Sequence, residues 1–105
     1  MNYDPENPLH VQERSWIGDA VLALVTREWI LEHGPADFTG RSEYYRNLTS
    51  NQFLSSFGHP AKVEAELGNA YLAGGLAAAR AVFEERFLPL FHRQELNRQK
   101  RRGRP

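Results

Sequence analysis

The sequence predicts an all-α protein, a single domain of about five helices joined by short connections. Three observations support this fold class. Apolar residues recur at helical spacing in three long segments, and no segment alternates between apolar and polar residues as a strand does. Glycine and proline residues separate the helical segments. The chain has 105 residues, 41% of them hydrophobic, which is enough for one core and too few for two domains.

The first long helix is expected over residues 11–32, after an extended lead-in over residues 1–10 that contains two prolines. Its apolar stripe uses the i, i+4, i+7 and i+8 positions, and two further residues widen it: Ile17, Val21, Leu24, Val25, Trp16 and Ala20. The helix should end before Gly34 and Pro35, because glycine is favoured just past a helix end and proline beyond it.

The middle of the chain is predicted to hold two short helices. Residues 36–40 are expected to form a loop, and Ser42 is a candidate N-cap for the first short helix. The segment Thr49–Asn51 offers N-caps for the second, over residues 52–57, which the following glycine and proline should end.

Two longer helices are expected in the C-terminal half. The first covers residues 61–73 and ends at a pair of glycines, and the second covers residues 76 to about 92. Pro89 should kink that second helix or end it early, because proline lacks the N–H that a helix interior needs. The folded domain is therefore expected over residues 11–92, followed by a tail over residues 93–105.

The net charge is zero, but the charged residues are unevenly distributed along the chain. Of the 13 basic and 13 acidic residues, six basic and one acidic fall in residues 93–105, so this tail is basic and the rest of the chain acidic. A basic segment attached to an acidic body indicates an anionic partner. A solvated, disordered terminus is the other interpretation, since short basic runs are common.

Composition also narrows the class of protein. The chain has no cysteine, which excludes disulfides, thiolate metal sites and a cysteine nucleophile. No apolar run approaches the length of a membrane span, and the polar, acidic N-terminus does not resemble a signal peptide. We therefore expect a cytoplasmic protein with no membrane partner.

Asp19 is the candidate functional residue of the first helix. It is the one acid in the apolar run from Trp16 to Val25, and a buried lone carboxylate is costly unless it is paired, hydrogen-bonded or bound to metal. Its own helix face offers no second acid, so its partner must come from another helix. Glu64 and Glu66 are the candidates, and because they point to nearly opposite sides of their helix, at most one can meet Asp19.

An Asp and a Glu that converge across two packed helices would form a site of hard oxygen ligands. Such a site suits Mg²⁺ or Mn²⁺, which also bind waters and phosphate oxygens. A metal ion bound in this way can activate water and stabilise displacement at phosphorus. Glu64 and Glu66 have a simpler interpretation as well, in which they pair with surface cations and contribute little.

Two segments resemble the catalytic domain of the ribonuclease III family. Glu13–Leu22, E-R-S-W-I-G-D-A-V-L, is similar to the family's signature helix, in which E-R-x-E-F-L-G-D-A-V-L is typical. Glu64–Leu76, E-A-E-L-G-N-A-Y-L-A-G-G-L, resembles the family's E-A-L-I-G-A-I-Y-L-D-x-G-L segment, and Leu48–Asn51 resembles the segment before its middle helix. The resemblance covers roughly residues 9–92, with both motifs in the family's order and on expected helices.

The resemblance implies that Asp19 and Glu64 are the catalytic and metal-binding residues, with Mg²⁺ or Mn²⁺ as cofactor. They match two of the family's four acids, and the other two fall on Ser15 and Ala61. Glu13 could replace the first missing acid only with a one-residue gap, which rotates the helix by about 100°. The compact Mini-III branch, which lacks a domain for binding double-stranded RNA, keeps mainly the two acids that are matched here.

The function that the resemblance implies is metal-dependent endonucleolytic cleavage of double-stranded or structured RNA by a homodimer, paired through the signature helix. The basic tail would contact RNA phosphates through Arg98, Lys100, Arg101, Arg102 and Arg104. A catalytically degenerate RNA-binding or ribosome-associated structural protein is the alternative, and Ser15 and Ala61 fit it. A helical protein–protein module, with a partner that covers the aromatic stripe, is a third hypothesis.

Overall fold

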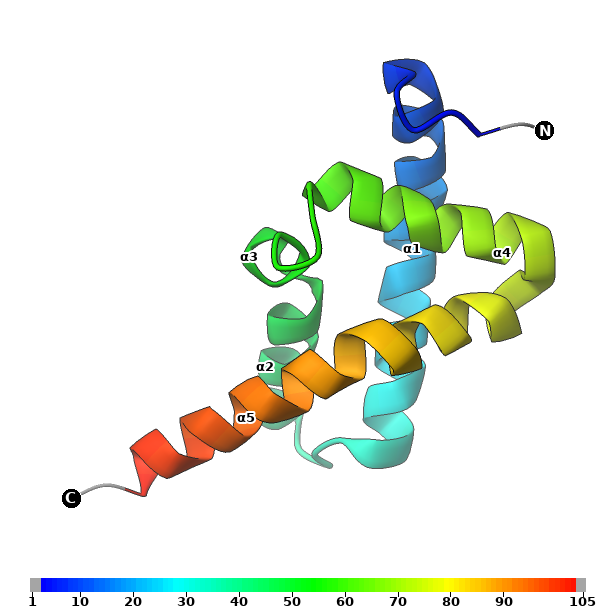
Figure 1. Ribbon diagram of the computed structural model, residues 1–105. Coiled ribbons are helices and arrows are strands. Elements are labelled where there is room, and N and C mark those ends of the chain that lie inside the picture. Colours follow the sequence, from blue (N-terminus) through cyan, green and yellow to red (C-terminus); the bar gives the residue numbers. More distant parts are fainter. Residues whose placement is uncertain (1–2, 104–105) are drawn as a thin grey trace.

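The computed structural model describes residues 3–103, and this part of the chain contains helices and no strand (Figure 1). The predicted all-α class, with about five helices, is confirmed. None of the described helices is both long and apolar enough to cross a membrane. The elements are α1 (Pro8–His33), α2 (Phe38–Thr49), α3 (Asn51–Leu54), α4 (Pro60–Val82), the π-helical turn η1 (Phe83–Phe87) and α5 (Leu88–Arg102).

Two helices begin several residues earlier than predicted, because residues assigned to loops cap them. α1 starts three residues early: the side chain of Asn7 caps its first turn, and Pro8 is well suited to the first helical position. α2 starts inside the predicted loop, because Asp37 and not Ser42 is its N-cap. The Asp37 carboxylate accepts a hydrogen bond of 2.9 Å from the backbone N–H of Gly40.

The C-terminal half contains two interruptions. α4 is kinked at Gly75, which has a φ of 74° and so adopts a conformation that favours glycine, at the place where a break was predicted. η1 then interrupts the expected helix over residues 76–92, and Pro89 lies in the first turn of α5, where its missing N–H is tolerated. Residues 93–102, predicted as a separate tail, continue α5 as a helix.

α1 is the central helix of the fold. Figure 1 shows α4 crossing the N-terminal half of α1, and the segment η1–α5 crossing the C-terminal half of α1. α2 and α3 lie to one side of α1. The contact between α1 and α4 is the most extensive in the molecule. A row of buried aromatic residues, Phe83, Phe87 and Phe91, joins η1 and α5 to the core, where Trp29 of α1 packs against Phe83 and Phe91.

α1 carries apolar residues on both of its faces. The inner face is buried in the core and includes Val21, Leu22, Val25, Trp29 and Ile30. The outer stripe faces solvent and consists of Leu9, Glu13, Trp16, Ala20, Leu24, Arg27 and Leu31. The single stripe predicted from the sequence was therefore partly wrong, because Trp16 is 79% exposed and Leu24 48% exposed.

Candidate functional site

The crossing of α1 and α4 brings the two helix backbones very close together. A Cβ atom placed on Gly18 would lie 1.7 Å from the carbonyl oxygen of Glu64, and one placed on Gly68 would lie 2.1 Å from that of Arg14. Only glycine fits at either position without moving the helices apart. Beside the crossing, Nε of the buried Arg14 donates a hydrogen bond of 2.7 Å to Oδ1 of Asn69. These contacts fix how the two helices are aligned.

This alignment places Asp19 of α1 beside Glu64 of α4, close enough for the two carboxyl groups to share a proton in a hydrogen bond. Burial of Glu64, the hydrogen bond and the negative charge of Asp19 together raise the pKa of Glu64 to about 7. Asp19 itself is exposed, so the expectation that its carboxylate would be buried was wrong, although the expected neighbour from another helix is present. The residue follows Gly18 and therefore lies at the border of the helix contact. The energetic cost of a charged Glu64 therefore comes from its own burial first and from the neighbouring charge of Asp19 second.

The other candidate acids do not join this pair. Glu66 forms an ion pair with Arg86 of η1, on a different side of α4. Glu13 lines the same surface groove as Asp19 and Glu64, yet no group of three or more Asp, Glu or His residues with metal-ligand geometry occurs among residues 3–103. Of the acids considered from the sequence, Asp19 and Glu64 are thus the pair that converges.

The acidic groove around this pair has a volume of about 700 Å³ and is lined by Gln12, Glu13, Ser15, Trp16, Asp19, Asn51 and Glu64. Ser15 and Ala61 are the two positions where the family resemblance lacks an acid. Ser15 lines the acidic groove, and both residues line an adjoining hollow of about 440 Å³. At these two positions the chain therefore has a hydroxyl group in the acidic groove and a methyl group in the adjoining hollow.

Asn51 is a groove residue that the sequence reasoning did not select. It is the first residue of α3, directly after Ser50, whose side chain caps that short helix by accepting a hydrogen bond from the N–H of Phe53. This cap directs the chain so that Asn51 lines the groove opposite α1 and α4. The segment Leu48–Asn51 was considered as a source of helix caps and as part of the family resemblance, but Asn51 was not selected as a site residue.

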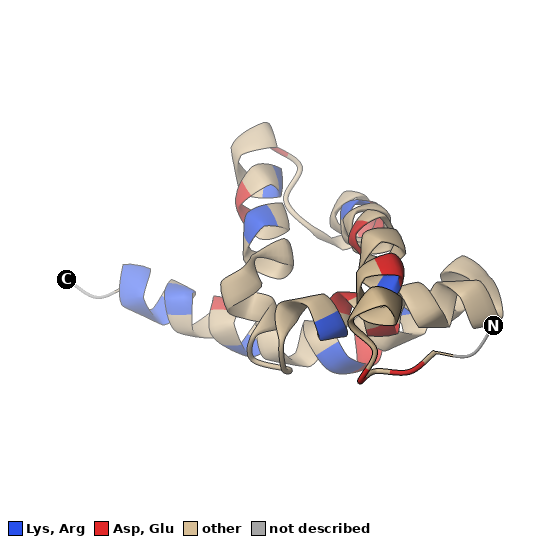
Figure 2. Ribbon diagram, turned by 90° about the horizontal axis from the view of Figure 1, so that it is seen from above, with Lys and Arg blue, Asp and Glu red and all other residues tan. Residues whose placement is uncertain are grey.

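The basic residues proposed from the sequence are not all free to bind an external partner. Arg102 donates a hydrogen bond of 2.6 Å to Glu43 of α2, and Arg98 donates one of 2.9 Å to Glu95. Lys100 and Arg101 are exposed, and Arg104 lies outside the described residues. Figure 2 shows the basic residues gathered towards the C-terminal end of α5.

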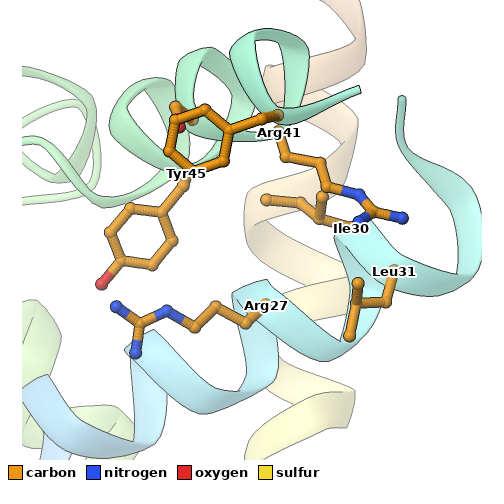
Figure 3. A pocket seen from close by; sticks show the side chains of 7 residues that line it. Arg27, Ile30, Leu31, Arg41 and Tyr45 are labelled. Atoms are coloured by element: carbon orange, nitrogen blue, oxygen red, sulfur yellow. The ribbon is translucent and has the colours of Figure 1, made fainter. Parts of the chain in front are cut away.

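An apolar hollow lies between α1 and α2 (Figure 3). This α1–α2 pocket has a volume of about 430 Å³ and is lined by Arg27, Ile30, Leu31, Phe38, Arg41, Ser42 and Tyr45. The Arg27 guanidinium lies 4.7 Å from the centre of the Tyr45 ring, and Nε of Arg41 donates a hydrogen bond to the carbonyl of Pro35. Because Arg27 and Leu31 also belong to the outer stripe, the pocket and the stripe form one continuous surface.

No model of a known protein family matches the chain, and comparisons with curated proteins and with solved structures give no match either. The interpretation of the acidic groove therefore depends on its geometry and on the resemblance of its two motifs.

Proposed function

We propose that the protein has a ribonuclease III-like fold and is a metal-dependent endoribonuclease that cleaves double-stranded or structured RNA. The observation that carries this proposal is the convergence of Asp19 and Glu64 at one open groove. They are the two residues that match the family's acids, and they come from separate motifs on different helices. The fixed crossing at Gly18 and Gly68 supports it further, because it holds the two carboxyl groups in place.

The groove offers ligands that fit Mg²⁺ or Mn²⁺. Burial of Glu64 and, after it, the neighbouring Asp19 raise the pKa of Glu64, and a bound cation would favour its charged form. Mg²⁺ is commonly held by one or two carboxylates together with substrate phosphates, so Asp19 and Glu64 are sufficient protein carboxylates. Asn51 adds a neutral oxygen to the same groove. When bound, such an ion supplies activation of water and stabilisation of charge on the phosphate.

The outer stripe of α1 supports a homodimer. Exposed apolar residues aligned along one helix are a typical sign of an unpaired interface. A two-fold axis near Ala20 would pack two α1 helices antiparallel, with Trp16 of one copy against Leu24 of the other. The same symmetry would place Glu13 of one copy beside Arg27 of the other, which is a complementary pair of charges.

This arrangement also brings the two acidic grooves close to the symmetry axis. Asp19 is adjacent to Ala20 in the chain, and Glu13 and Trp16 belong both to the groove and to the outer stripe. Two such grooves on either side of a two-fold axis match the two-fold symmetry of an RNA duplex, in which each groove would face one strand. The same residues therefore support both the proposed homodimer and the proposed activity.

Cleavage of a long RNA duplex by the purified protein tests this function. With Mg²⁺ or Mn²⁺ we expect cutting that EDTA abolishes, and a loss of about 100-fold or more in Asp19→Asn and in Glu64→Gln. Glu66→Gln is the matched control, since it is the same substitution two residues further along and Glu66 binds Arg86 outside the groove. Its rate should stay within about twofold of the wild type.

The alternative function is a catalytically degenerate RNA-binding or ribosome-associated structural protein. Ser15 and Ala61 favour it, because the groove lacks acids at those positions. If the wild type binds the duplex and cuts it with neither metal, this alternative replaces the nuclease. If it shows no affinity for RNA, the helical protein–protein module becomes the interpretation.

A further inference from the structure

A polar pocket separate from the acidic groove lies where α2 and α3 meet α5. It has a volume of about 240 Å³, and we call it the amide pocket after the side chains that line it: Asn47, Ser50, Gln52, Phe53, Ser56, Gln94 and Arg98. Six of these seven residues are polar, and none of the described residues that line it carries a carboxylate. The pocket therefore presents many hydrogen-bond donors and one cation.

Arg98 is held in place with part of its guanidinium unsatisfied. Its Nε donates a hydrogen bond of 2.9 Å to Oε2 of Glu95, and its guanidinium carbon lies 5.8 Å from the centre of the Phe91 ring. Its Nη2 is buried and has no hydrogen-bond partner among residues 3–103. A buried charged donor without an acceptor is unfavourable. Arg98, which lines the amide pocket, therefore keeps one donor unpaired within the described residues.

We propose that the amide pocket binds a phosphoryl group. A phosphoryl group presents several acceptor oxygens at once, which suits the guanidinium of Arg98, the amide groups of Asn47, Gln52 and Gln94, and the hydroxyl of Ser56. Glu95 neutralises much of the charge of Arg98, so binding depends on the hydrogen bonds more than on long-range attraction. Glu95 binds Nε of Arg98 without lining the pocket, which leaves the lining itself free of carboxylates.

The phosphoryl group has two sources, a free phosphate or phosphomonoester and the backbone of RNA. α3 connects the pocket to the candidate active site, because Asn51 lines the acidic groove while its neighbours Ser50 and Gln52 line the amide pocket. An RNA strand lying in the acidic groove would therefore pass close to the amide pocket. Binding of RNA in this way rests on the proposed function, whereas binding of free phosphate does not.

The test is a titration of the full chain with inorganic phosphate at constant ionic strength, followed by NMR of the backbone and side-chain amides. We expect saturable shifts at the side-chain amides of Asn47 and Gln94. We expect affinity to fall about tenfold or more in Arg98→Gln, because the charge-assisted hydrogen bonds are lost. Arg93→Gln is the matched control: it removes the same charge from α5 at a residue that does not line the pocket. It should change the affinity by less than about twofold.

A second variant guards against an effect of Arg98→Gln on folding. Gln94→Glu keeps the size of the side chain and Arg98 itself, and it places a carboxylate in the pocket, so it should also weaken phosphate binding about tenfold or more. Phosphate affinity unchanged in Gln94→Glu, or shifts confined to Lys100 and Arg101, overturn the proposal. So does the absence of saturable binding to both phosphate and RNA.

The RNA source is tested with a short duplex and the Asp19→Asn variant, so that cleavage cannot contribute. Binding of the duplex that weakens in Arg98→Gln and not in Arg93→Gln identifies RNA phosphate as the ligand. Binding of inorganic phosphate alone, with the same dependence on Arg98, identifies a free phosphate or phosphomonoester. The second result leaves the phosphoryl site standing even where the proposed nuclease activity fails.

Discussion

The two faces of α1 are similar in composition and opposite in structural role. The inner face packs against α4, and through Trp29 against Phe83 of η1 and Phe91 of α5, and it includes Gly18, where the helix backbones meet. The outer stripe presents Trp16 and Leu24 to solvent. Asp19 lies at the border between the two, next to Gly18 in the chain. Close backbone approach at glycine, more than hydrophobicity, therefore determines which face of this helix joins the core.

The largest expected effect comes from adding one methyl group to the inner face. Gly18→Ala places a Cβ atom 1.7 Å from the carbonyl oxygen of Glu64, so the helices must separate or the local structure must shift. We expect a loss of about 3 kcal/mol or more in the free energy of unfolding, in spite of the better helix propensity of alanine. Urea denaturation followed by circular dichroism measures it.

Gly103→Ala is the control for this prediction, because a Cβ atom there would make only ordinary contacts, the nearest at 3.5 Å. Its unfolding free energy should change by no more than about 0.5 kcal/mol. Equal stability of Gly18→Ala and the wild type would remove the distinction between the two faces of α1.

The second effect concerns the outer stripe. Leu24→Asp should prevent pairing of two α1 helices, because it places charges in the proposed interface, and we expect the dimer dissociation constant to rise about 100-fold or more. Sedimentation equilibrium measures this against a chain mass of 12.1 kDa. Leu96→Asp is the matched control: Leu96 is 52% exposed, close to the 48% of Leu24, and it lies on α5. Equal effects of both substitutions would show that the outer stripe is no special surface.

The third effect is a pH dependence of the unfolding free energy, caused by Asp19 and Glu64 at the border between the two faces of α1. Because the pKa of Glu64 is raised to about 7 in the folded state, the folded protein binds more protons than the unfolded chain between the ordinary carboxyl pKa and this value. Stability in EDTA should therefore fall as the pH rises through this range. Asp19→Asn removes the neighbouring charge and should raise stability at about pH 8 by about 1–2 kcal/mol, with little change at about pH 4.

Urea denaturation at both pH values measures this difference. Glu66→Gln should keep the wild-type dependence, since Glu66 binds Arg86 away from the pair. Addition of Mg²⁺ at about pH 8 should stabilise the wild type more than Asp19→Asn, because binding to the folded state favours it. A pH dependence that is identical in wild type and Asp19→Asn would mean that the two carboxyl groups do not interact.

The sequence predicted much of the fold and the central pair of the candidate site. Helical periodicity and glycine breaks gave the all-α class, and the two motifs selected Asp19 and Glu64. The inner and outer faces of α1 could not be separated, because both are apolar and the covering helices come from distant segments. The environment of Arg98 was likewise hidden, since Asn47 and Ser56, which share its pocket, lie far away in the chain. Local patterns predict elements well and long-range neighbours poorly.

The smallest expected effect joins the outer stripe to the rest of its own chain. The Arg27 guanidinium lies over the Tyr45 ring, and at an exposed site such a contact is worth about 0.5–1 kcal/mol (Figure 3). In the monomeric Leu24→Asp background, Arg27→Gln should therefore lower the unfolding free energy by about this amount.

In the dimer the same substitution should also weaken association, because Arg27 would lose Glu13 of the other copy. A double-mutant cycle with Glu13→Gln measures that coupling, expected to be about 0.5–1 kcal/mol. A coupling energy of zero would show that Arg27 and Glu13 do not pair across the proposed interface. Arg27 would then contribute only to the contact between α1 and α2 within one chain.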